Sequence, residues 1–331
     1  MTGQGQGQGK KQGQGQGKRA VLYVFSGTGN TRLAADKIAE GLRESGMQTT
    51  VYEVRAPFTD APDPNGYDVC GFGYPIHAFN APQFFLRFVR GLPAVQPGKY
   101  AFVFKTSGEP FHANSASSYS LMRLLKGKGF APAMDRHLLM PYNIMFRYND
   151  ALAKQMYLHT LRMAAMLADT VAEGRREKLR YYPWTVALMY LLRLQWFGAW
   201  INGPLTRANR QKCAACGRCA MECPAGNITM RDGLPQFGWK CTMCMRCTFR
   251  CPRDAVRPGF LNAWRVNGPY PFEKLAANDA VPATYVNADT KGYFRLFRRY
   301  YRRTERELAA YEASVQQAAE AAASRQSAAC G

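Results

Sequence analysis

The sequence predicts an α/β protein: a doubly wound parallel sheet of five strands, joined to a small α+β domain rich in cysteine. Two observations predict this organisation. Short apolar runs alternate with segments of helical periodicity over residues 20–175, which is typical of a parallel sheet covered by helices. Eight of the ten cysteines then lie between Cys213 and Cys251, within a predicted domain at 206–260. A chain of 331 residues is long enough for both domains to hold a core.

The chain begins with a repeat of Gly and Gln that also contains Lys10, Lys11, Lys18 and Arg19. No apolar run falls within residues 1–19, so we expect a disordered basic tail and no secretory signal. The cysteines lie far from this tail in one block, unlike those of a short secreted disulfide scaffold. The thiols therefore predict a reducing, cytoplasmic setting.

Five short apolar runs predict the strands of the sheet. The first is followed by a break that contains Gly27 and Gly29, and the fourth by a long polar loop at 106–118. The strands are expected at 20–25, 49–54, 67–73, 100–105 and about 136–140. Cys70 falls inside the third strand, where we expect it to act as a small buried apolar side chain.

Apolar residues at helical spacing separate the strands. Leu33, Ala34, Ile38 and Leu42 follow the first strand and predict a helix that ends at Gly46. Further helices are expected at 82–91, about 119–128 and about 150–173. This alternation over residues 20–175 favours parallel strands with helices on both faces of the sheet.

Residues 176–205 join the two predicted domains. The stretch 184–201 is mostly apolar and about as long as a membrane span, but it contains Arg193 and Gln195. An arginine near the middle of a span costs a few kcal/mol. We therefore predict an apolar connector helix packed between the domains, with attachment to a membrane surface as the second interpretation.

Two runs of cysteine repeat the spacing C-x-x-C-x-x-C-x-x-x-C-P. The first run is Cys213, Cys216, Cys219, Cys223 and Pro224, and the second is Cys241, Cys244, Cys247, Cys251 and Pro252. Three thiolates two residues apart let a tight loop hold three corners of a cuboidal cluster. Zinc sites usually combine one C-x-x-C pair with a distant second pair. The spacing thus favours two four-iron–four-sulfur (4Fe-4S) clusters over zinc, and disulfides rank third.

The cysteine runs lie in a basic part of a basic chain. The formal net charge is +21, from 44 Lys and Arg against 23 Asp and Glu. Between residues 207 and 257 only Glu222, Asp232 and Asp254 oppose the cations. Such a surplus predicts an acidic partner or surface, such as an acidic protein, nucleic acid or anionic lipid. Near a cluster, positive charge raises the reduction potential and favours docking onto an acidic redox protein.

A glycine-rich loop follows the first strand and opens the first helix. Its residues are Ser26, Gly27, Thr28, Gly29, Asn30 and Thr31, directly after Phe25. Backbone N–H groups and the positive end of the helix can hold a phosphate there, and the hydroxyls can donate further hydrogen bonds. The pattern is neither G-x-G-x-x-G nor a loop with a Walker lysine. A plain strand-to-helix turn is the alternative.

Both motifs resemble known families. The loop is similar to the first loop of flavodoxins, (T/S)-x-T-G-N-T, which binds the phosphate of FMN. The segment with the cysteine runs resembles the bacterial two-cluster ferredoxin domain. Together, residues 20–260 resemble the EFR1-type flavodoxin–ferredoxin fusion family, which implies a flavodoxin-like fold and a two-cluster ferredoxin domain in one chain.

The resemblance implies which residues bind the cofactors. In two-cluster ferredoxins the fourth cysteine of each run ligates the other cluster, so Cys251 is expected with the first run and Cys223 with the second. In flavodoxins two further loops flank the flavin ring at the carboxyl ends of strands. The first is expected to supply Tyr74, Pro75, Ile76, His77, Ala78 and Phe79, and the second Thr106, Ser107 and Gly108.

The resemblance also implies a function. We expect electron transfer between two 4Fe-4S clusters and FMN, which relays electrons between redox partner proteins. No second nucleotide-binding domain for a nicotinamide is recognisable in the sequence. The alternative is an FMN-dependent oxidoreductase that reduces a quinone-like small molecule with electrons from the clusters.

The last part, residues 261–331, is predicted to be a basic, helical extension. Arginines and aromatic residues alternate within 293–303. This pattern suits an amphipathic helix on the protein's own surface or on anionic lipid, and less well the stacking of nucleic acid bases. Cys330 lies near the end and receives no role.

Overall fold

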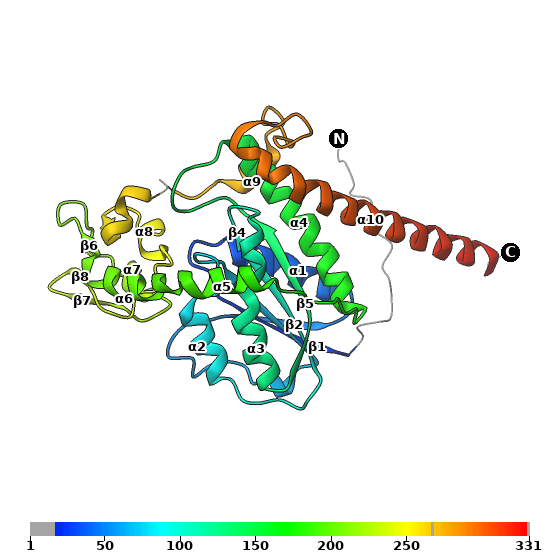
Figure 1. Ribbon diagram of the computed structural model, residues 1–331, viewed down its shortest axis with the longest axis horizontal. Helices are drawn as coiled ribbons and strands as arrows, with labels where there is room; N and C mark the ends of the chain where they lie inside the picture. Colours follow the sequence, from blue (N-terminus) through cyan, green and yellow to red (C-terminus); the bar gives the residue numbers. More distant parts are fainter. Residues whose placement is uncertain (1–16, 266–267, 330–331) are drawn as a thin grey trace.

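A computed structural model of the protein describes residues 17–265 and 268–329 (Figure 1). The predicted tail therefore lies almost wholly outside the described residues, as does Cys330. The first part of the molecule is a sheet with its helices, which we call the sheet body. A connector leads from it to a cysteine module at 207–257, and a carboxyl-terminal extension returns to the sheet body.

The sheet body contains five parallel strands in the order β2-β1-β3-β4-β5. They are β1 (Arg19–Val24), β2 (Gln48–Glu53), β3 (Val69–Pro75), β4 (Lys99–Ser107) and β5 (Phe130–Leu139). A strand order of 2-1-3-4-5 is that of the flavodoxin-like doubly wound fold, so the predicted fold class is confirmed. Only β5 departs clearly from its predicted range, because it begins at Phe130 instead of near residue 136.

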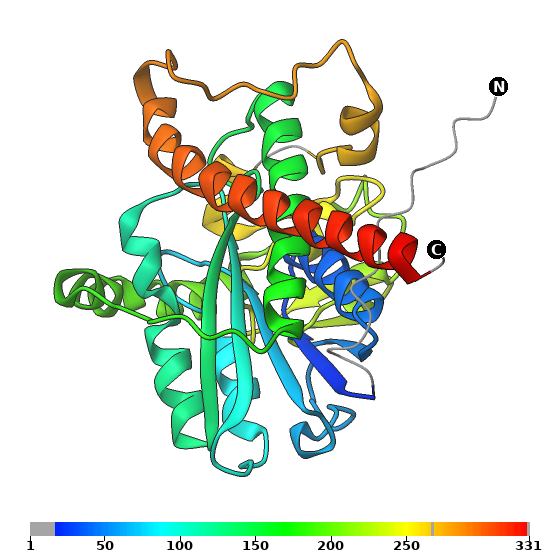
Figure 2. The same ribbon diagram turned by 90° about the vertical axis from the view of Figure 1, so that its right-hand side faces the viewer.

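Helices cover both faces of this sheet (Figures 1 and 2). Alternate residues of a strand point to opposite faces. In β1, Leu22 packs with Ile38 of one helix layer, whereas Tyr23 packs with Phe88 of the other. The first layer is α1 (Asn30–Glu44) and α4 (Asp150–Ala172), and the second is α2 (Gln83–Gly91) and α3 (Tyr119–Gly127). Cys70 is fully buried in β3, as expected, and burial raises the pKa of its thiol to about 12.

The connector consists of two helices instead of one. α5 (Pro183–Leu191) and α6 (Gln195–Leu205) are joined by a 3₁₀ turn, η3 (Leu192–Leu194). At this turn Arg193 donates a hydrogen bond to Ser120 Oγ and lies over the rings of Tyr190 and Trp196, at 4.0 and 4.9 Å. The arginine thus faces the protein at the break. Within the described ranges no helix is long and apolar enough to cross a membrane.

The cysteine module is built from very short elements. Its ends pair as the antiparallel strands β6 (Arg207–Ala208) and β9 (Val256–Arg257). A hairpin, β7 (Ile228–Arg231) and β8 (Leu234–Phe237), lies between the two cysteine runs. Each run contains one four-residue helix, α7 (Arg218–Met221) or α8 (Arg246–Phe249).

The extension begins with η4 (Gly259–Trp264), which lies against α6. It then packs back onto α4 through α9 (Phe272–Ala277), η5 (Gly292–Phe294) and α10 (Arg295–Ala329). α10 crosses over α4 (Figure 2). The aromatic side chains Phe297, Tyr300 and Tyr301 are buried in this contact, while the neighbouring arginines are exposed. The segment is therefore an amphipathic helix on the protein's own surface, and these three rings are not free to stack on bases.

Candidate functional site

The three loops predicted to bind a flavin meet at one edge of the sheet. β1, β3 and β4 all end there, because parallel strands carry their carboxyl ends to the same side. Thr31 Oγ1 and Thr106 Oγ1 share a hydrogen bond of 2.7 Å, and Ile76 N donates to Thr106 O at 2.8 Å. The ring of His77 lies 6.4 Å from that of Phe25. The structure thus brings the first, second and third loops together.

The glycine-rich loop has the form of an anion cradle. Gly29 caps α1 with φ of 115°, in the left-handed region that favours glycine. Ser26 and Thr31 are buried, and Ser26 Oγ accepts a hydrogen bond from Arg32 N at 3.2 Å. Within the described residues no protein acceptor is found for the N–H groups of Thr28 and Gly29. Free N–H groups at the positive end of a 15-residue helix are suited to a phosphate.

A segment after β5 also reaches this loop, and sequence reasoning missed it. Asn30 Nδ2 donates to Pro141 O at 2.9 Å, and the amide of Asn143 donates to Thr28 Oγ1. Tyr142 packs against Gly108 and donates a hydrogen bond to Glu109. No motif marks these residues. Their position directly after the last parallel strand is the one signal that could have placed them at the same edge.

The second loop is a strained turn. His77 and Asn80 exchange two backbone hydrogen bonds of 2.9 Å, while Ala78 and Phe79 between them have φ of 40° and 60°. Positive φ at non-glycine residues costs energy and is concentrated at ligand sites. Burial lowers the pKa of His77 to about 4, so the imidazole is neutral at pH 7.

Tyr74, by contrast, points away from the edge. It is fully buried within β3, with its ring 5.6 Å from that of Phe85 and its hydroxyl 3.4 Å from Ser117 Oγ. Pro75 and Ile76 are half-buried. His77 and Phe79 therefore remain the aromatic groups of this loop that a ligand at the edge can contact.

The third loop, which the sequence predicts to be long and polar, is compact. Its residues His112–Ser118 form the 3₁₀ helix η2. Ser107 Oγ donates to Glu109 O at 2.8 Å, and Asn114 Nδ2 donates to the same oxygen at 2.8 Å. These bonds close the loop over Thr106, Ser107 and Gly108.

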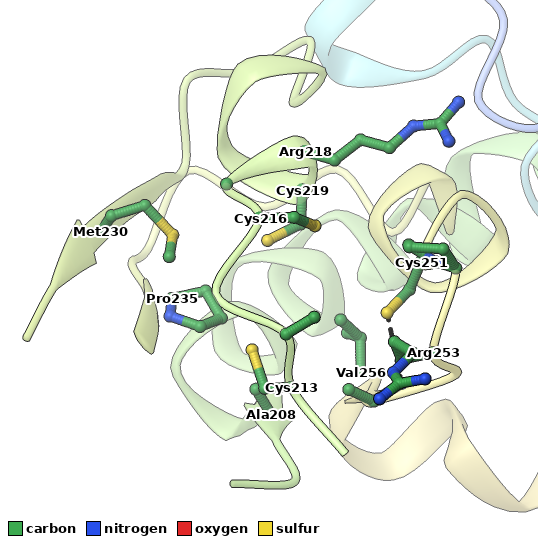
Figure 3. A pocket seen from close by; sticks show the side chains of 14 residues that line it. Ala208, Cys213, Cys216, Arg218, Cys219, Met230, Pro235, Cys251, Arg253 and Val256 are labelled. Atoms are coloured by element: carbon green, nitrogen blue, oxygen red, sulfur yellow. Dashed lines mark hydrogen bonds between the residues drawn. The ribbon is translucent and has the colours of Figure 1, made fainter. Parts of the chain in front are cut away.

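The structure groups the cysteine thiols across the two runs. Four of them line one cavity, with their side chains around the same hollow (Figure 3). We call this group the distal set: Cys213, Cys216, Cys219 and Cys251. Burial raises the pKa of Cys247, and the nearby Cys244, Cys241 and Cys223 raise it further. We call Cys223, Cys241, Cys244 and Cys247 the proximal set.

Cys251 thus lies with thiols of the first run and Cys223 with thiols of the second, while the ligation of clusters by these sets stays a prediction. All described cysteines are free thiols. In residues 17–265 and 268–329 no three His, Cys, Asp or Glu side chains are placed to hold a metal ion.

The two cysteine runs repeat one unusual backbone path. Ala215 and Met243 occupy the same place in the two runs, with φ of 52° and 51°. Gly217 and Met245 are the next matching pair, with φ of 70° and 62°. Two runs of different sequence thus share the same left-handed turns, even at a bulky methionine. Such shared strain is expected where a loop must wrap a ligand.

The proximal set lies directly against the glycine-rich loop. A Cβ atom on Gly27 would overlap the carbonyl oxygen of Cys244, so only glycine allows this approach. Ala56 N donates to Pro224 O at 2.7 Å beside it. The residues that line the distal cavity all belong to the cysteine module. The distal set is therefore the one farther from the sheet.

Arg246 joins the module to the sheet body, a role that the sequence did not reveal, since it shows Arg246 only as one of the cations between residues 207 and 257. Its guanidinium is buried and donates to Gly27 O at 3.1 Å, to Ser26 O at 2.5 Å and to the carboxylate of Glu53. Burial acts to raise the pKa of Glu53, but the hydrogen bond and charge of Arg246 outweigh it, and the pKa lies below its ordinary value.

A second cavity of about 290 Å³ lies between the sheet body, α6 and the cysteine module. His77 of the second loop and Cys241 of the proximal set both line it. Its walls also carry Trp196, whose buried Nε1 has no hydrogen-bond partner, and two cations, Arg87 and Lys240. No Asp or Glu is among the lining residues.

Comparisons with known proteins found similar solved structures but no related sequence. Neither a protein-family model nor a curated protein sequence matches the chain. Oxidised flavodoxin 1 from Bacillus cereus is 21% identical, with a TM-score of 0.34, over 44% of this chain and 95% of that one. A short-chain flavodoxin associated with a bacterial microcompartment is 14% identical, with a TM-score of 0.37, over 47% and 98%.

A third similar structure is an NAD(P)H:quinone oxidoreductase from Methanothermobacter marburgensis. It is 16% identical, with a TM-score of 0.31, over 47% of this chain and 98% of that one. Likenesses this distant assign neither a fold nor a function. The flavodoxin-like assignment itself rests on the strand order described above.

Proposed function

We propose that this protein is an iron–sulfur flavoprotein of the flavodoxin–ferredoxin fusion type, which transfers electrons between two 4Fe-4S clusters and one FMN. The observation that carries the proposal is the contact between Cys244 of the proximal set and Gly27 of the glycine-rich loop. It sets one cluster position directly beside the predicted phosphate loop. FMN exchanges one or two electrons and each cluster exchanges one, so the chain would relay electrons between redox partner proteins.

The cysteine sets suit 4Fe-4S clusters in number, residue type and environment. The thiols of the distal set line one cavity, and those of the proximal set are electrostatic neighbours of one another. Burial raises the pKa of Cys241 to about 12, so the buried thiols need positive charge beside them to ionise. Cluster iron supplies that charge, and the folded loops in return hold the iron.

The glycine-rich loop suits the phosphate of FMN. The N–H groups of Thr28 and Gly29 and the hydroxyl of Ser26 would bind its oxygens, at the positive end of α1. His77 and Phe79 would flank the flavin ring on one side, and the half-buried Ser107, between the buried Thr106 and Gly108, would face its edge. Tyr74 is left out of this set because its side chain lies inside the core.

The charge of the chain supports acidic redox proteins as partners. The net charge is +21, and the module that would exchange electrons is itself basic. Cations near the sets favour the reduced, more negative state of a cluster and steer an acidic partner toward it.

Analysis of the protein purified without oxygen tests the proposal. We expect about eight iron and eight sulfide ions and about one FMN per chain, since each cluster holds four of each. Zinc in place of iron, without flavin, would overturn the proposal.

Electron transfer across the Gly27 contact can be tested separately. A methyl group in Gly27→Ala would push the loop and the proximal set apart, so we expect slower reduction of the flavin by the clusters in stopped-flow experiments. Gly91→Ala is the matched control, because a Cβ atom there meets nothing within 4 Å. Equal rates in both variants would show that electrons do not cross at this contact.

The 290 Å³ cavity favours a second candidate function, the reduction of a quinone-like small molecule. It joins a predicted flavin-contact residue, His77, to Cys241, and it offers the unpaired N–H of Trp196 to a carbonyl oxygen. Steady-state reduction of a small naphthoquinone, weakened in Trp196→Phe through a higher KM, would support it. Absence of turnover by the reduced protein would leave the electron carrier as the function.

A further inference from the structure

The two connector helices expose a large apolar surface. Leu191 and Phe197 are 73% and 67% exposed, and other large side chains beside them are about half exposed. We call this surface the connector face: Trp184, Leu191, Phe197, Trp200, Ile201 and Leu205. Globular proteins rarely expose contiguous apolar patches of this kind unless they bind a protein or a membrane.

The connector face continues onto the cysteine module. The ring of Trp200 lies 4.5 Å from that of the exposed Trp239. Phe260, also exposed, packs beside Gly198 of α6. The exposed apolar side chains therefore continue from α5 and α6 onto the module. Figure 1 shows the two helices one after the other between the sheet body and the module.

The helices are held on the protein by polar contacts on their inner side. Asn80 Nδ2 donates to Met189 O at 3.0 Å, and Phe260 N donates to Asn202 Oδ1 at 3.0 Å. α5 and α6 have 9 and 11 residues, whereas a span needs about 20. Both helices are largely apolar and too short to cross a membrane, so a contact with lipid would place them along its surface.

The charge around the connector face is all of one sign. No Asp or Glu occurs between Lys178 and Met221. Apart from Arg193, which is turned toward Ser120, the cations in this stretch are Lys178, Arg180, Arg207, Arg210, Lys212 and Arg218. A second copy of the chain would bring these cations against each other, which is unfavourable. An anionic lipid surface complements them, and Trp and Tyr are the side chains enriched at membrane–water interfaces.

We propose that α5 and α6 dock the protein onto the surface of an anionic membrane, with the connector face in the headgroup region. This goes beyond the proposed function and does not depend on it. The sheet body remains in water, while the cysteine module and the 290 Å³ cavity are held close to the lipid.

Vesicle flotation of the full-length, metal- and flavin-loaded protein tests the proposal. We expect flotation with vesicles that combine phosphatidylcholine and phosphatidylglycerol, and much less with phosphatidylcholine alone. Raising the salt from about 0.1 M to about 1 M shortens the screening length from about 10 Å to about 3 Å and should weaken binding. Binding to both vesicle types alike would overturn the choice of an anionic surface.

Variants assign the binding to the connector face. Leu191→Ser and Phe197→Ser should each lower vesicle partitioning by about tenfold or more, since each removes a large apolar side chain from the contact. Both residues are exposed, so iron content and the thermal transition should stay unchanged. Leu296→Ser is the control, because Leu296 is an exposed apolar residue on α10.

Other outcomes count against the proposal. Loss of binding in Leu296→Ser but not in the connector variants would place the lipid contact on α10. Sedimentation that shows a dimer, dissociated by Phe197→Ser and indifferent to vesicles, would make a second copy of the chain the occupant of the connector face.

Discussion

The sheet body holds its strands between two apolar layers, whereas the cysteine module has almost no apolar interior. In the body, Leu22, Phe72, Phe102 and many neighbours are completely buried. In the module a few scattered apolar side chains are buried, such as Ala225, Ile228 and Val256. Its strands and helices have two to four residues. A region this small needs another source of stability, and metals commonly supply it. The sheet body is thus specified by its apolar pattern, whereas the cysteine module is specified by the spacing of its thiols.

Loss of one cluster should break the module without breaking the body. In Cys223→Ser we expect iron to fall to about half, because the proximal set loses one of four ligands. Residues 207–257 should then lose protection in hydrogen exchange, while the strands of the body keep theirs. The variant Cys70→Ser, which changes a cysteine outside both sets, should keep the full iron content of the protein. Unchanged exchange in the module of Cys223→Ser would mean that its fold does not need the cluster.

The converse change should weaken the body and spare the module. Phe102 is completely buried in the layer between the sheet and α1 with α4. Phe102→Ala should lower the free energy of unfolding by about 3–5 kcal/mol. Urea unfolding followed by circular dichroism measures this, and iron per folded chain should not change. A loss of iron from the folded variant would contradict the separation of the two regions.

Arg246 is where the two regions depend on each other. Arg246→Met would remove the hydrogen bonds to two loop carbonyls and one of the two arginines that hold Glu53, since Arg55 remains paired with it, and we expect a loss of about 1–3 kcal/mol together with weaker FMN binding. Arg218 occupies the same place in the first cysteine run but is exposed, and among the residues that the structure describes its ion pair is with Glu222. Arg218→Met should leave the free energy of unfolding nearly unchanged, because exposed ion pairs contribute little. Similar losses in both variants would show that the contact with the loop is not special.

A smaller, pH-dependent effect should belong to the body. Burial lowers the pKa of His159 to about 4, with Arg162 adding to the shift, against an ordinary value of 6.5. The unfolded chain therefore binds a proton that the folded chain does not, and stability should fall as the pH drops from about 7 to about 5. One such group contributes up to about 1.4 kcal/mol per pH unit. His159→Gln should flatten the dependence of the urea midpoint, and an unchanged slope would assign it to His77 or His137, whose pKa values are also lowered.

The alternation of apolar runs predicted the body well, because each strand and helix carries its own period. The first four strands lie within a few residues of their predicted ranges. The start of β5 was missed because Pro132, Asp135 and Arg136 interrupt its apolar pattern, while a neighbouring strand holds them in the sheet. The break between α5 and α6 was missed for a related reason, since Arg193 turns toward Ser120 on a distant helix.

The site was predictable as far as local motifs reach. Spacing and loop residues pointed to the cysteine sets and to the glycine-rich loop. The contact of Gly27 with Cys244, the role of Arg246 and the approach of Asn143 were not predictable, because they join residues far apart in the chain and no period marks them. Left-handed φ at Met243 and Met245 is equally invisible in a sequence, since methionine seldom adopts it.

The pairing of β6 with β9 has a practical consequence. Residues 207 and 257 face each other in one short antiparallel ladder, so everything between them leaves and re-enters at a single point. The region from one to the other is in effect a cassette, which a short turn could replace without stretching the chain on either side. A protein trimmed in this way would offer the sheet body alone for flavin titration. Grafting a different cassette at the same two residues would exchange the proposed electron input while the rest of the molecule stays the same.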